Sequence, residues 1–171
     1  MLASVPEFLK RRATRSFQYL MKEVEAVTPE QALADRRAGW PGQQWGIGQD
    51  GSIAGIVYHV ASWKHLSLPL FEPGGGILAL ADFNASAAPA SDDWPALVTW
   101  LRTVGTQWSD KLSALPEEAF AAVHQFDEWE SPLWEFVVEF YEHDIQHAAQ
   151  IEYLRQRHAL PTNSGESAGN E

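Results

Sequence analysis

The sequence of 171 residues contains no cysteine. This absence excludes disulfide bonds, thiolate zinc sites and a cysteine nucleophile. A metal ion in this protein must therefore be bound by histidine, aspartate or glutamate side chains. The chain also has no thiol of its own to offer to a reaction.

Positive charge is scarce, and long apolar runs are absent. Lys and Arg number 12 against 23 Asp and Glu, for a net charge of -11. This balance argues against nucleic acid or an anionic membrane as a partner, because nothing offsets the repulsion of phosphates. No stretch approaches a membrane span, and the first residues lack the apolar run of a signal peptide. We expect a cytoplasmic protein with a small-molecule substrate.

Apolar residues are plentiful enough for a folded core. They make up 45% of the chain and include eight Trp. A chain of this length and composition is typical of one globular domain. We expect this domain at residues 1–160, followed by a polar, disordered tail at residues 161–171.

Helical periodicity and capping residues predict four long helices. They are expected at residues 6–26, at 53–70, from the cap at 91–93 to 115, and from the cap at Ser131-Pro132 to 158. Shorter helices are expected at 29–37 and from 116, with loops at 38–51 and 73–91. No alternation of apolar and polar residues is long enough to build a sheet. The sequence therefore predicts an all-α fold, a four-helix bundle.

Two histidines on the last predicted helix indicate a metal site. His143 and His147 are four residues apart, a spacing that places two side chains on one helical face. The same face carries apolar residues, so the pair faces a core, where an unpaired imidazole is costly and metal binding would explain it. The alternative is a chance pair on a solvent-exposed face. The apolar residues of that face are Phe136, Phe140, Ile151 and Leu154.

His59 is the best candidate for a third ligand. It lies in the middle of a predicted helix, on an apolar face beside Ile56 and Trp63. His65 lies roughly 240° further round that helix and cannot share the face of His59. The remaining two histidines, in a connecting segment and at a helix end, suit surface positions: His124 and His158.

Two neighbours of the histidine pair are candidates for orienting a ligand ring. Glu139 and Gln150 fall near the same face and could hydrogen-bond a ligand histidine, although Glu139 could equally be a surface carboxylate.

The order His143-Asp144-x-x-His147 is also similar to the HExxH motif of zinc proteases. Asp144 is shorter than Glu and points about 100° away from His143, which disfavours a protease.

Two stretches of the sequence resemble the DinB/YfiT-like family of metal-dependent enzymes, and the resemblance covers nearly the whole chain. The first runs from Gly46-Ile47-Gly48 through Ser52-Ile53-Ala54-Gly55-Ile56-Val57-Tyr58-His59-Val60-Ala61-Ser62-Trp63. It looks like the family's Gly/Trp loop, which leads into a helix with one ligand histidine. The second, His143-Asp144-Ile145-Gln146-His147-Ala148-Ala149-Gln150-Ile151, is similar to the family's HxxxHxxQ helix. The order and separation of the two stretches also match.

The resemblance implies a variant up-and-down four-helix bundle with a divalent metal bound by His59, His143 and His147. Relatives include thiol-dependent S-transferases and a mycothiol-dependent maleylpyruvate isomerase, and family analogy also suggests a homodimer. It therefore implies a metal-dependent transfer to a small electrophile, with a low-molecular-weight thiol as co-substrate.

The residues themselves leave the metal and the reaction open. Zinc is the first choice for three imidazole ligands, and nickel, iron and copper are alternatives. The same ligands would serve a metal-dependent hydrolase, and a bundle without activity would serve as an interaction module. No catalytic residue beyond the ligands can be named. The segment 73–76 and the loop with Trp40 and Trp45 are candidates for the entrance to the site.

Overall fold

A computed structural model describes residues 4–37, 50–72, 74–78, 88–126 and 129–159. Four long helices dominate it: α1 (Val5–Glu25), α3 (Ile53–Ser67), α4 (Trp94–Ala114) and α5 (Leu133–Ala159). The shorter elements are α2 (Pro29–Leu33), the 3₁₀ turns η2 (Leu68–Phe71) and η5 (Glu117–Ala121), and the strands β1 (Val123–Phe126) and β2 (Trp129–Pro132). The all-α prediction is confirmed. None of the described helices is both long and apolar enough to cross a membrane.

The helices begin where the sequence supplies capping side chains. The Ser52 hydroxyl accepts a hydrogen bond from the Gly55 amide at the start of α3, and Asp93 accepts one from Ala96 at the start of α4. Thr28 and Gln31 form a reciprocal capping box on α2. Each such cap stabilises its helix by about 1 kcal/mol, so these boundaries are encoded locally.

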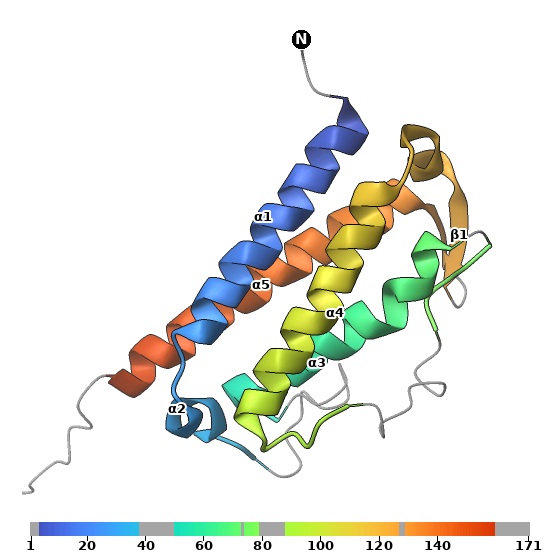
Figure 1. The fold of residues 1–171 in the computed structure, drawn as a ribbon. Helices are drawn as coiled ribbons and strands as arrows, with labels where there is room; N and C mark the ends of the chain where they lie inside the picture. Colours follow the sequence, from blue (N-terminus) through green and yellow to red (C-terminus); the bar gives the residue numbers. More distant parts are fainter. Residues whose placement is uncertain (1–3, 38–49, 73, 79–87, 127–128, 160–171) are drawn as a thin grey trace, which may run out of the picture.

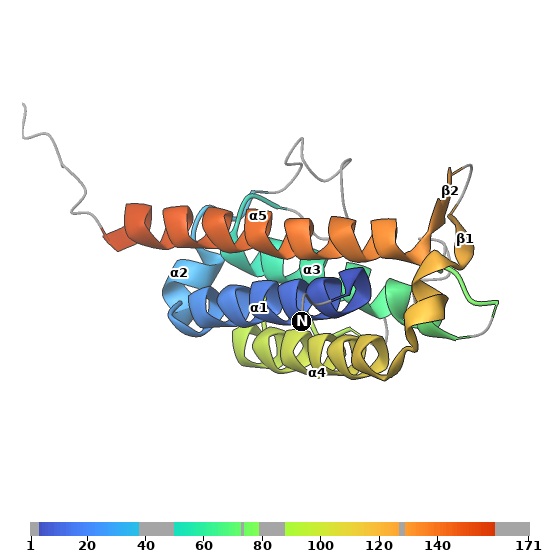
Figure 2. The same ribbon diagram turned by 90° about the horizontal axis from the view of Figure 1, so that it is seen from above.

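The helices α1 and α5 lie side by side and form one pair, and α3 and α4 pack together as a second pair (Figures 1 and 2). The two pairs meet where α1 contacts α4 and where α5 contacts α3. The last helix, α5, runs in the direction opposite to that of α3 (Figure 1). Where α1 meets α4, the Phe17 ring lies close to Gly105, and a Cβ atom at that position would overlap the ring. The bundle therefore brings α3 and α5, which carry the candidate ligands, into direct contact.

One prediction about the segment before α5 is wrong, because it contains a short sheet. Residues 123–126 and 129–132 form an antiparallel hairpin in which Val123 pairs with Pro132 (Figure 2). Strands of four residues are too short to show the alternation that would have revealed them. The last helix begins at Leu133, directly after Ser131 and Pro132 of β2, and the Ser131 hydroxyl donates to the Glu135 carboxylate in its first turn.

Other boundaries agree within a few residues or lie outside the described residues. The helix expected at 29–37 is shorter, because α2 ends at Leu33 and Ala34 is already extended. α3 ends at Ser67 and Pro69 enters the η2 turn, as expected for a proline that cannot continue a helix. The short helix expected from residue 116 is the turn η5. Trp40, Trp45 and the tail at 161–171 lie outside the described residues, so the division into a domain at 1–160 and a tail stays a prediction.

Candidate metal centre

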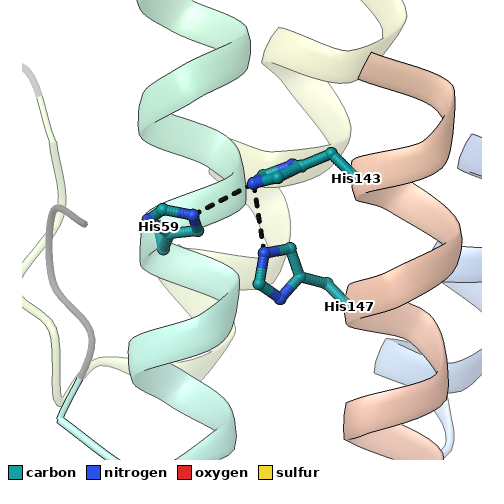
Figure 3. A group of neighbouring side chains, drawn as sticks. All are labelled: His59, His143 and His147. Atoms are coloured by element: carbon teal, nitrogen blue, oxygen red, sulfur yellow. Dashed lines mark hydrogen bonds between the residues drawn. The ribbon is translucent and has the colours of Figure 1, made fainter. Parts of the chain in front are cut away.

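The three predicted ligands meet where α3 and α5 are in contact (Figure 3). His59 and His147 are each 4% exposed, and His143 is half-buried between them. The Nε2 atom of His143 lies 3.0 Å from that of His59 and 3.1 Å from that of His147. The structure thus joins residues 84 positions apart in the sequence into one cluster.

The spacing of these nitrogens fits a metal ion. Zinc binds imidazole nitrogen at about 2.0–2.1 Å in a tetrahedral arrangement, which places two ligand nitrogens about 3.3 Å apart. One ligand atom from each of the three histidines lies within 4.8 Å of the others. An ion would therefore require only small adjustments of the rings.

The surroundings favour the uncharged form of two of the imidazoles, those of His143 and His147. Burial, with the neighbouring His147, His59 and Lys64, lowers the pKa of His143 to about 2. Burial also lowers the pKa of His147, although its hydrogen bond to Gln150 opposes that change. Metal ligation requires neutral imidazole, so protons would compete little for this cluster at neutral pH.

Gln150 orients one of the rings. The His147 Nδ1–H donates to the Gln150 Oε1 atom at 2.8 Å. An amide oxygen only accepts hydrogen bonds, so the contact places the ring proton on Nδ1 and leaves the Nε2 lone pair facing the cluster. This is the role predicted for Gln150. Glu139 is exposed on α5, which agrees with its alternative interpretation as a surface carboxylate.

Replacing Gln150 with leucine is expected to weaken metal binding by about 10- to 100-fold, the usual effect of removing a partner that orients a ligand histidine. Leucine keeps the size of the side chain but cannot accept the Nδ1 proton. Competition with a coloured chelator measures the affinity. Gln156→Leu on the same helix is the matched control, because Gln156 contacts Glu152 and no histidine of the cluster. Equal losses in the two variants would contradict the role of Gln150.

Asp144 forms a buried ion pair that the sequence did not predict. It is 1% exposed, and both of its carboxylate oxygens lie 2.9 Å from the Nζ atom of Lys64, which is 2% exposed. Burial raises the pKa of the Asp144 carboxyl, and Lys64 and the Ser16 hydroxyl oppose that change. Asp144 therefore faces the bundle interior and not the three Nε2 atoms, which agrees with the prediction against a protease.

The ion pair joins the two helices that carry the cluster. Lys64 follows His59 on α3 by five residues, and Asp144 is adjacent to His143 on α5. The ammonium group also lies 5.2 Å from the centre of the Phe17 ring and 4.9 Å from that of Trp108. A signal was present in the sequence, since Lys64 is the only Lys, Arg, Asp or Glu residue in α3.

The other histidines lie apart from the cluster, as predicted. His124 is half-buried in β1, where its Nδ1–H donates to the Gly75 carbonyl at 2.8 Å. That contact holds the chain at Gly75 against the hairpin. Among the described contacts, none joins Gly75 to the histidine cluster. His158 lies 3.5 Å from Asp35, and the His65 ring lies near Trp100.

A helical bundle with three converging histidines, two buried and one half-buried, fits the class of metal-binding helical-bundle proteins. The chain belongs to the DinB superfamily, whose family model matches residues 11–151. That match includes all three histidines of the cluster, the whole of α3, and α5 as far as Ile151. Comparisons with curated proteins and with solved structures find no significant match.

Proposed function

We propose that this chain is a metal-dependent enzyme that transfers a low-molecular-weight thiol to a small electrophile. His59, His143 and His147 would hold one divalent ion, with zinc as the first choice and nickel or iron as alternatives. The observation that carries the proposal is the convergence of three imidazole nitrogens, one from each histidine, at the contact of α3 with α5.

Three protein ligands leave a coordination position open, which distinguishes catalytic from structural zinc sites. Bound there, a divalent ion would act as a Lewis acid that lowers the pKa of a thiol or a water molecule. The residues of the chain hold the three nitrogens in place and limit the access of water, and burial favours the uncharged form of His143 and His147. Because the chain has no cysteine, the thiol must come from a co-substrate.

The proposed reaction is a substitution. The sulfur atom of the thiol forms a bond to an electrophilic carbon, and the leaving group departs with the electron pair of the broken bond. The thiol proton passes to solvent. Hydrolysis of a small molecule would use the same three histidines and is the second candidate.

A panel of thiols tests the proposal. Glutathione, bacillithiol, mycothiol and coenzyme A are each incubated with a chlorinated aromatic acceptor, using metal-loaded and metal-free protein. We expect chloride release and a thioether product only when both metal and one of the thiols are present. Turnover that needs metal but no thiol would indicate a hydrolase. No turnover together with no bound metal would favour a non-catalytic interaction module.

The proposal includes a homodimer working in the cytoplasm. Large apolar side chains are exposed on the outer surfaces of α1 and α5, among them Phe8 and Trp134. Burying such a surface between two copies would stabilise a dimer. Sedimentation at micromolar concentration is expected to show the dimer mass, and a monomer alone would contradict this part. Cell fractionation tests the location.

A further inference from the structure

A pocket of about 280 Å³ lies between α3, α5 and the segment that follows α2. This volume is just below the usual range for small-molecule sites, which begins at about 300 Å³. Its lining combines charged and apolar side chains, including Asp35, Arg37, Ile56, Gln150, Leu154 and Arg157.

The pocket begins one helical turn from the histidine cluster. Ile56 precedes His59 by three residues on α3, and Gln150 follows His147 by three residues on α5. Because α3 and α5 run in opposite directions (Figure 1), both residues lie at the same end of the cluster. One helical turn rises about 5.4 Å, so the pocket lies next to the cluster along α3 and α5. Gln150 connects the pocket with the cluster, since it lines the pocket and hydrogen-bonds His147.

The charge of the pocket is opposite to that of the chain. Two guanidinium groups, of Arg37 and Arg157, line it against one carboxylate, of Asp35, while the whole chain carries -11. Asp35 contacts Arg157 and adopts a φ of 62°, a left-handed conformation that is uncommon for residues other than glycine. Guanidinium groups bind carboxylate and phosphate oxygens through paired hydrogen bonds. The pocket therefore offers an oxyanion a favourable place in an otherwise repulsive protein.

The apolar part of the pocket lining favours a ligand with an apolar body. Ile56, Leu154 and the ring of Tyr153 line the pocket beside the charged groups. We propose that this pocket binds a small molecule with an apolar body and a single oxyanion group, such as an aromatic carboxylate. Its use as the electrophile site rests on the function proposed above, whereas the binding itself does not.

Calorimetry with benzoate tests the pocket, using the metal-free protein so that the anion cannot bind to a metal ion. Benzamide, which has the same shape without the charge, and inorganic phosphate, which lacks the apolar body, are the comparison ligands. We expect benzoate to bind at least tenfold more tightly than either, because a hydrogen bond to a charged group contributes about 1.5–3 kcal/mol. Benzamide or phosphate binding as tightly as benzoate would overturn the proposal.

Substitutions locate the binding. Arg37→Gln, Arg157→Gln and the double variant are expected to weaken benzoate binding, by about tenfold or more in the double variant. Arg102→Gln is the matched control, since Arg102 is an exposed arginine of α4 that pairs with Glu25 at 2.9 Å. Circular dichroism confirms that each variant is folded, and Arg37→Gln alone leaves the contact of Arg157 with Asp35 intact. Unchanged affinity in the double variant would overturn the proposal.

The two proposals can fail separately. Benzoate binding that depends on the arginines, without turnover or bound metal, would support the pocket and remove the proposed reaction. Thiol transfer whose KM for a chlorinated aromatic carboxylate is unchanged in the double variant would support the reaction and remove the pocket as its electrophile site.

Discussion

Replacing Lys64 with alanine is expected to lower the free energy of unfolding by about 3–5 kcal/mol. The substitution leaves the Asp144 carboxylate, 1% exposed, without its main partner in the bundle interior. The charged group then loses the attraction that offsets its removal from water. Urea unfolding, followed by far-ultraviolet circular dichroism on metal-free protein, measures the change.

Two further variants show whether the unpaired charge is the cause. The double variant Lys64→Met, Asp144→Leu removes both charges, and we expect it to regain most of the lost stability, as replaced buried ion pairs often do. Lys111→Ala removes the exposed partner of Glu72 and should cost less than about 1 kcal/mol. A loss for Lys64→Ala no larger than for Lys111→Ala would contradict the importance of the buried pair.

Alanine at His147 is expected to abolish the stabilisation of the protein by zinc. A ligand at 100 times its dissociation constant stabilises the native state by about 2.7 kcal/mol, which gives a clear rise in the melting temperature of the wild-type protein. Removing one of three ligands should weaken zinc binding more than 100-fold, the upper end of the effect of losing a mere orienting group. Melting curves with and without zinc measure both.

His65→Ala is the matched control for this prediction. His65 lies on the same helix as His59, is half-buried and has its ring near Trp100, away from the cluster. We expect its variant to keep the full response to zinc, whereas alanine at His59 or His143 should remove it. An equal loss in the His65 variant would show that zinc acts elsewhere on the protein.

The features that depend on local signals were predictable from the sequence. Ser52 begins α3 through a hydrogen bond to an amide three residues away, and Pro69 follows its end, so both boundaries are encoded within a few residues. The pairing of His143 with His147 also follows from helical geometry alone. His59 was placed with them because it shared an apolar face with Ile56 and Trp63, and the structure brings its Nε2 atom to His143.

Three other features, which depend on contacts between distant segments, were not predictable. The ion pair of Lys64 with Asp144 requires the relative positions of α3 and α5, which no local pattern specifies. The hairpin before α5 depends on pairing between two four-residue strands whose sequences show no alternation. The pocket near Gln150 draws its arginines from the ends of two segments 120 residues apart, at Arg37 and Arg157.

The metal content of protein purified without a histidine tag tests the central claim most directly. We predict one divalent ion per wild-type chain by elemental analysis, and none in the variant with alanine at His59, His143 and His147. Full occupancy in that variant, with the fold intact by circular dichroism, would contradict the assignment of these three histidines as the metal site.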